Sequence, residues 1–346
     1  YNVTISATRS LTGPNVGANT LFHVEKDWTN DGTFTHNNSS AYFDGNISGQ
    51  ITTTNGTTTT FYRLYINKPG TAANSIVTQN AATTSVTNLF TMTDGTYEML
   101  TNTLSGAANV TMVGDSVRMA KTGVTLPELT GATYTISGGR MVFYGTGAQT
   151  IKSLPTATTA QYYDIRFDGT GTKTLAGPIY VANDLTITNA TLKANAAGNL
   201  ITMAGGDWLH NHASAAYTHD NNTVQFIGTT AQTISGLSGL TLHNMIENQS
   251  GAGTLTLTDA GTFTLTVNNL LTMSDGCFDT RTNTLTGTAG LTMVGDSLKL
   301  AKVLGSTTLP ELTGSYNVTG GTIVFYGAGN EDIRSLPTSG SAQYYN

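Results

Sequence analysis

Residues 89–121 read LFTMTDGTYEMLTNTLSGAANVTMVGDSVRMAK, and residues 270–302 read LLTMSDGCFDTRTNTLTGTAGLTMVGDSLKLAK. Leu89 of the first stretch thus corresponds to Leu270 of the second. Later phrases keep nearly the same offset, since LPELTG starts at Leu126 and Leu309, and AQYY starts at Ala160 and Ala342. Matches of this length indicate two copies of one unit of about 182 residues.

The repeat boundaries follow from the shared phrases. We predict a first repeat unit at residues 1–162 and a second at residues 163–346. The chain begins YNVTI and ends AQYYN, and its middle reads AQYYDIRF from Ala160. The end of the second copy therefore matches the join between the copies, and we expect the array to continue into further units that begin like Tyr1.

Both copies show the pattern of short strands. Residues 255–301 contain LTLT, FTLTV, LLTM, NTLTG, LTMVG and SLKLA, in which apolar residues alternate with threonine. This period of two is typical of a strand with one buried face, and threonine suits the solvent face. Dipeptides such as DG, NN and SG between the runs supply the tight corners. No stretch of ten residues has helical spacing, so we predict an all-β fold.

Two all-β architectures compete. In a parallel β-helix, or β-solenoid, coils of about 20 to 23 residues stack on one another. In tandem β-sandwiches, antiparallel sheets pack face to face. The short strands and the recurring phrases VFYGTGAQTI at Val142 and VQFIGTTAQTI at Val224 favour the solenoid.

Composition excludes several classes of partner. Only 10% of the residues are charged, against about 25% in ordinary soluble domains, and 67 of the 346 residues are threonine. The net charge is −6 and the basic residues are scattered singly, so we expect no nucleic-acid partner. No apolar run is long enough for a spanning helix, so we expect no membrane insertion in this segment. The single cysteine, Cys277, excludes an internal disulfide framework.

The phrases YYDIRFDGTGTKTLAG at Tyr162, NDLTITNATL at Asn183 and FYRLYINKPG at Phe61 resemble the repeats of giant cell-surface and secreted proteins of the Bacteroidetes group. The resemblance implies a parallel β-helical stalk on a bacterial cell surface or outside the cell. It also implies O-glycosylation in Asp-Ser/Thr-apolar triplets. Asp115-Ser116-Val117 and Asp296-Ser297-Leu298 match this pattern at equivalent places, which makes Ser116 and Ser297 the candidate sites. Alternatively, both triplets are simple Gly-Asp turns.

Motifs for chemistry are weak. His210 and His212 would share one strand face and could bind a metal, but the first copy lacks the pair. Cys277 aligns with Thr96, which argues against a nucleophile. The acidic and basic residues are nowhere dense enough for the Asp, Lys and Arg cluster of a polysaccharide lyase. We therefore predict no catalytic residue, no metal, no cofactor and no enzyme activity.

The predicted function is structural: a segment of an extracellular repeat protein that forms a fibre, stalk or filament with other copies of the repeat, covalently or end to end. The alternative is an adhesin module that binds surface glycans through aromatic side chains. Its candidates recur once per unit, at Trp28 and Trp208, Phe143-Tyr144 and Phe325-Tyr326, and Tyr162-Tyr163 and Tyr344-Tyr345. Buried inside a coil, the same residues would instead form aromatic ladders.

Overall fold

The computed structural model describes residues 1–14, 21–56, 58–70, 75–196, 198–211, 216–237, 239–251, 253–258, 263–295, 297–302, 308–330 and 332–336. The chain forms two compact units, Tyr1–Lys173 (unit 1) and Thr174–Asn346 (unit 2). The repeat boundary predicted between residues 162 and 163 lies inside unit 1 and stays a prediction about the sequence repeat. All regular elements in the described ranges are β-strands, and no helix there could cross a membrane.

Unit 1 has strands on three sides of a coil. The first sheet holds, in spatial order, β1 (Val3–Ile5), β4 (Trp28–Asn30), β7 (Gly49–Thr52), β9 (Ile76–Gln79), β11 (Thr96–Glu98), β14 (Ser116–Met119), β17 (Arg140–Phe143) and β19 (Asp164–Phe167). The second holds β3 (Leu21–Val24), β6 (Ser40–Phe43), β8 (Thr59–Asn67), β10 (Thr83–Asp94), β13 (Asn109–Met112) and β16 (Tyr134–Ile136), with β12 (Thr103–Ser105) beside β10. The third side has the pairs β2 (Ser10–Thr12) with β5 (Thr33–Thr35) and β15 (Thr125–Leu126) with β18 (Gln149–Ile151).

Unit 2 repeats this plan. Its first sheet holds β22 (Leu185–Ile187), β25 (Trp208–His210), β28 (Gln232–Gly236), β30 (Thr254–Leu257), β32 (Cys277–Asp279), β35 (Ser297–Leu300) and β39 (Thr322–Phe325). The second holds β21 (Ile179–Val181), β24 (Leu200–Met203), β27 (Thr223–Gly228), β29 (Leu240–Gln249), β31 (Thr264–Asp275), β33 (Thr284–Gly287) and β37 (Glu311–Leu312), with β34 (Gly290–Met293) and β38 (Tyr316–Val318) continuing from β31. The third side has β23 (Thr191–Lys193) with β26 (Ala216–Thr218), and β36 (Thr308–Leu309) with β40 (Asp332–Ile333). The remaining strand, β20 (Thr172–Leu175), spans the border between the units.

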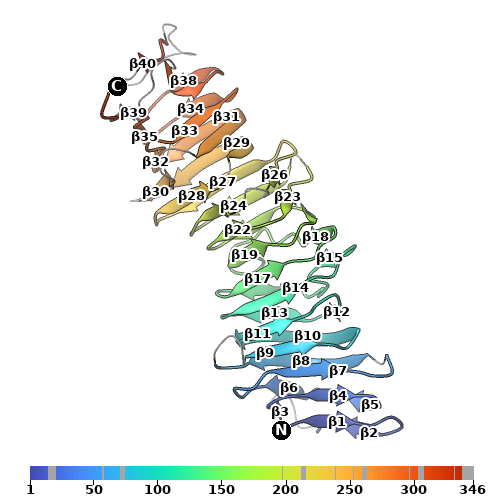
Figure 1. The fold of residues 1–346 in the computed structure, drawn as a ribbon. Coiled ribbons are helices and arrows are strands. Elements are labelled where there is room, and N and C mark those ends of the chain that lie inside the picture. Colours follow the sequence, from blue (N-terminus) through green and yellow to red (C-terminus); the bar gives the residue numbers. More distant parts are fainter. Residues whose placement is uncertain are drawn as a thin grey trace. The chain divides into compact units, whose positions relative to one another are not determined.

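Each unit is a β-solenoid, as predicted. The strand pairs of the described ranges are parallel, and each joins a strand to one in the next coil (Figure 1). The sandwich alternative is wrong, because sandwiches are built from antiparallel sheets. Coil length varies within unit 1, since Thr96 is in register with Ser116 whereas Gly49 is in register with Val77. Some coils are therefore longer than predicted, because the connections vary while the strands stay in register.

The core consists of apolar columns that run from coil to coil. One column on the first sheet of unit 1 stacks Val77, Tyr97, Val117, Met141 and Ile165 in exact register, and each is at most 2% exposed. Their neighbours in sequence point outward, as the alternation predicts. Burial of a side chain of this size contributes about 1.5–3 kcal/mol, so every coil is stabilised by the coils on either side.

A single glycine forms the corner between the second and first sheets. Gly95 lies between β10 and β11 with φ of +86°, and Gly276 lies between β31 and β32 with φ of +95°. Both values are in the left-handed region that side chains other than glycine disfavour. The DG phrases of the two copies therefore make the same corner, as predicted.

The two copies also share an ion pair. Lys121 Nζ lies 2.8 Å from Glu128 Oε2, and Lys302 Nζ lies 2.8 Å from Glu311 Oε1. The glutamate of each LPELTG phrase therefore pairs with the lysine that ends the repeated stretch quoted above. This match in three dimensions supports the alignment of the copies.

Candidate ligand-binding groove

Charged and hydroxyl side chains gather on the outer face of the first sheet of unit 1, at β14, β17 and β19. Register places Ser116, Arg140 and Asp164 in one outward column, and Arg118, Val142 and Arg166 in the next. Ser116 and Arg118 point outward because they alternate with Val117 and Met119, which are buried in the core. Side chains far apart in sequence thus become neighbours on successive coils.

These residues line a hollow of about 470 Å³. Its charged lining consists of three arginines and two aspartates, and Ser116 and Thr96 add hydroxyl groups; the charged residues are Arg118, Arg140, Arg166, Asp115 and Asp164. The sequence did not predict this cluster, because the basic residues are scattered singly along the chain. The signal that could have revealed it was the spacing of the three arginines, which are 22 and 26 residues apart along the chain and so about one coil apart.

Each arginine of the hollow makes one ion pair. Arg118 Nε lies 2.8 Å from Glu98 Oε2, Arg140 Nη2 lies 3.2 Å from Asp164 Oδ2, and Arg166 Nη2 lies 3.0 Å from Asp168 Oδ2. The arginine side chains are 36–42% exposed, so solvent screening keeps the stabilisation from each pair small.

Arg118 also stacks on an aromatic ring. Its guanidinium carbon lies 4.9 Å from the centre of the Tyr144 ring, and the Tyr144 hydroxyl donates a hydrogen bond to Glu98. Burial raises the pKa of Tyr144, and the hydrogen bond to Glu98 raises it further. The hydroxyl therefore remains a donor at physiological pH, and this end of the hollow is held rigidly.

Two carboxyl groups meet at the turn beside the hollow. A side-chain hydrogen bond between Asp94 and Asp115 raises the pKa of Asp94, and burial adds to the effect. Asp115 Oδ2 also accepts a hydrogen bond of 2.5 Å from the backbone N–H of Gly95. Carboxyl groups in hydrogen-bond contact are closer than the roughly 5 Å or more that glycoside cleavage needs. We therefore interpret this pair as a brace of the corner.

The predicted glycosylation sites lie in regular strands. Ser116 is half-buried in β14, and its hydroxyl lies 3.0 Å from that of Thr96 on the preceding coil. Ser297 is half-buried in β35 opposite Cys277 of β32. The neighbouring Asp296 lies outside the described residues. O-glycosylation of Ser116 and Ser297 stays a prediction, which mass spectrometry of peptides from the native protein would test.

The other sequence candidates separate in space. His210 is buried in β25, and His212 lies outside the described residues. Cys277 is half-buried in β32. Among the described residues, no group of three or more His, Cys, Asp or Glu side chains could hold a metal ion.

Four of the eight recurring aromatic residues that the structure describes are in the core. Trp28, Trp208, Phe143 and Tyr162 have no exposed surface, and Trp28 packs against Phe61 with ring centroids 5.1 Å apart. These four side chains cannot stack on a sugar, and their burial agrees with the alternative of aromatic packing inside the coil. Of the others, Tyr326 is 46% exposed, Tyr144, Tyr163 and Phe325 are partly exposed, and Tyr344 and Tyr345 lie outside the described residues.

The sequence reading also missed an outward aromatic stripe. His23, Tyr42 and Tyr65 lie in register on β3, β6 and β8, with ring centroids 5.6 and 5.4 Å apart. The rings lean on one another across neighbouring coils, which makes this stripe a second ladder rather than a flat platform.

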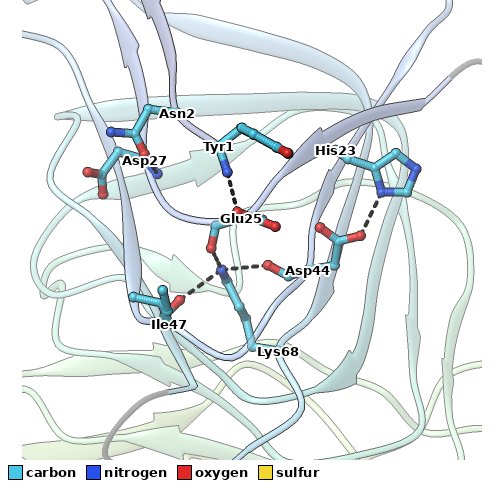
Figure 2. A network of polar contacts seen from close by, with 8 residues as sticks. All are labelled: Tyr1, Asn2, His23, Glu25, Asp27, Asp44, Ile47 and Lys68. Atoms are coloured by element: carbon cyan, nitrogen blue, oxygen red, sulfur yellow. Dashed lines mark hydrogen bonds and ion pairs between the residues drawn. The ribbon is translucent and has the colours of Figure 1, made fainter.

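A buried lysine lies at the end of β8 (Figure 2). Lys68 has no exposed surface, and its ammonium group donates to the backbone carbonyls of Glu25, Asp44 and Ile47, the last two at 2.9 Å. Burial lowers the pKa of Lys68, although Asp44, Asp27 and Glu25 raise it. The residue at the equivalent place in unit 2 is Gln249, which is also buried. The lysine therefore serves to satisfy carbonyl groups where three coils meet.

Comparison with known proteins identifies no relative: no family model, no curated protein and no solved structure matches the chain.

Proposed function

We propose that this chain is a structural segment of an extracellular bacterial repeat protein that forms a fibre, stalk or filament at the cell surface. Its partners would be further copies of the same repeat, joined covalently or end to end. The observation that carries the proposal is the in-register apolar column, of which Val77, Tyr97, Val117, Met141 and Ile165 are one example. Such columns make stacking itself the source of stability.

The physics of stacking supports a mechanical role. Each coil is hydrogen-bonded to its neighbours along parallel ladders, and repeat arrays gain stability mainly from these nearest-neighbour interfaces. The outward positions are rich in threonine, which tolerates the pleated surface, and they allow a soluble surface with only 10% charged residues. A shape of this kind can be lengthened by adding copies without redesigning the core.

The sharing of features between copies supports the same proposal. The corner glycines Gly95 and Gly276 and the ion pairs of Lys121 and Lys302 occur in both units. The two copies therefore share the residues that turn the chain at a corner and that pair between segments of the coil.

Electron cryotomography of the native cells, with gold-labelled antibodies raised against this chain, tests the proposal. We expect label on extended structures outside the cell envelope, and no label on a strain that lacks the gene. Label confined to the cell interior, or to separate globular particles, would overturn both the location and the structural role.

A further inference from the structure

We propose that the hollow on β14, β17 and β19 binds a carboxylate-bearing polysaccharide, a chain of uronic acid sugars. This inference is independent of the structural role, because a stalk could carry such a site or lack it. Its basis is the arrangement of Arg118, Arg140 and Arg166 around the 470 Å³ hollow.

The hollow has more donors than acceptors. Within the described residues each of the three arginines makes one hydrogen bond through its guanidinium, and the other N–H groups of each guanidinium remain available. The Nε atoms of Arg140 and Arg166 are buried and have no partner there. A buried N–H without an acceptor is unfavourable, and a ligand oxygen that draws the guanidinium outward would satisfy it.

The acceptors of the hollow are already engaged. Asp115 accepts from the Gly95 N–H, Asp164 accepts from Arg140, and the hydroxyl groups of Ser116 and Thr96 bond to each other. The three arginines are already paired with carboxylates, Arg118 with Glu98, Arg140 with Asp164 and Arg166 with Asp168. A ligand must therefore supply acceptors that bind the remaining N–H groups, and carboxylates do so because they pair with arginine in the strongest geometry.

The order of the arginines favours an extended ligand over a compact ion. They come from three successive coils, which are spaced about 4.8 Å apart. Arg118 and Arg166 share one column two coils apart, and Arg140 lies on the coil between them in the neighbouring column. A pyranose ring in an extended chain has about the length of this coil spacing. A polyuronate lying along the stack would thus present one carboxylate to each coil.

The second copy supplies a tolerated substitution for a test. The equivalents of Arg118 and Arg140 in unit 2 are Lys299 and Thr322, and Thr322 occupies β39 at the same register position. The variant Arg140→Thr therefore places in β17 a residue that the fold already accepts. The control is Arg63→Thr on β8, in the other sheet, because it removes the same charge outside the hollow.

Isothermal titration calorimetry of the full chain would use polygalacturonate and alginate, with methyl-esterified polygalacturonate as the uncharged comparison. We expect at least one polyuronate to bind and the ester not to bind. Arg140→Thr should weaken binding about ten- to a hundredfold, which is the effect of losing one charge-assisted hydrogen bond. Arg63→Thr should change the affinity less than about twofold, because it removes a charge that does not contact the ligand. Circular dichroism melts would confirm that both variants fold. Absence of binding by both polyuronates, equal binding of the ester, or equal losses in the two variants would overturn the proposal.

Discussion

The corner at Gly95 allows a quantitative test of why the coil turns where it does. A β-carbon at Gly95 would lie 2.5 Å from the backbone oxygen of Ser75 and 2.7 Å from Cβ of Lys68, whereas one at Gly123 would meet nothing within 4 Å. Both glycines have positive φ, +86° and +78°. Gly95→Ala and Gly123→Ala therefore share a backbone penalty and differ in steric clash.

The expected magnitudes follow from these distances. The left-handed conformation costs an L-residue about 1–2 kcal/mol, which is the whole expected loss for Gly123→Ala. Overpacking adds about 1–3 kcal/mol, so Gly95→Ala should lower the free energy of unfolding of unit 1 by about 2–5 kcal/mol.

Tryptophan fluorescence during urea unfolding can report on one unit alone. The chain has two tryptophans, and the buried Trp28 and Trp208 lie in different units. In a Trp208→Phe background, Trp28 reports on unit 1. Equal losses in Gly95→Ala and Gly123→Ala would refute the argument that close approach of Ser75 and Lys68, and not φ alone, requires glycine at this corner.

Three further predictions concern buried and titrating groups. Lys68→Met should lower the free energy of unfolding of unit 1 by about 3 kcal/mol or more in urea, because three carbonyls lose their donor. Lys68→Gln, which copies Gln249, should lower it clearly less. Equal decreases in the two variants would contradict the role of Lys68 as a donor to these carbonyls. Burial lowers the pKa of His219, stacked 5.4 Å from His243, and the neighbouring Asp220 raises it only in part. The unfolded chain then binds more protons than the folded chain, so the free energy of unfolding should fall as pH drops through about 6.5. The fall should be less steep in His219→Gln. The same dependence on pH in His219→Gln and the unchanged protein would contradict this role of His219. Burial lowers the pKa of Lys173 to about 8, so the free energy of unfolding should rise between pH 8 and about 10. In thermal unfolding experiments, Lys173→Met should show a smaller rise over this pH range.

The all-β class, the duplication and the solenoid could be predicted from local patterns. Alternation of apolar residues with threonine identifies the inward face of each strand, because side chains alternate at a period of two whatever the neighbours are. The DG phrase before Thr96 and Cys277 predicts a left-handed corner, because glycine alone adopts it readily. These features depend on a few adjacent residues, which explains why the sequence was sufficient for them.

The partners across coils were decided only by the tertiary structure. Coil length is not constant in unit 1, as the register pairs Thr96 with Ser116 and Gly49 with Val77 show, so the outward side chain that meets Arg140 cannot be counted off along the chain. The arginine hollow and the carbonyls around Lys68 depend on that register. Its recurrence in each unit made Trp28 a candidate for sugar stacking, yet Trp28 is fully buried, and so is the charged Lys68. The alternation of apolar residues with threonine thus determined the inward face of the regular strands, and the connections between strands determined which side chains meet.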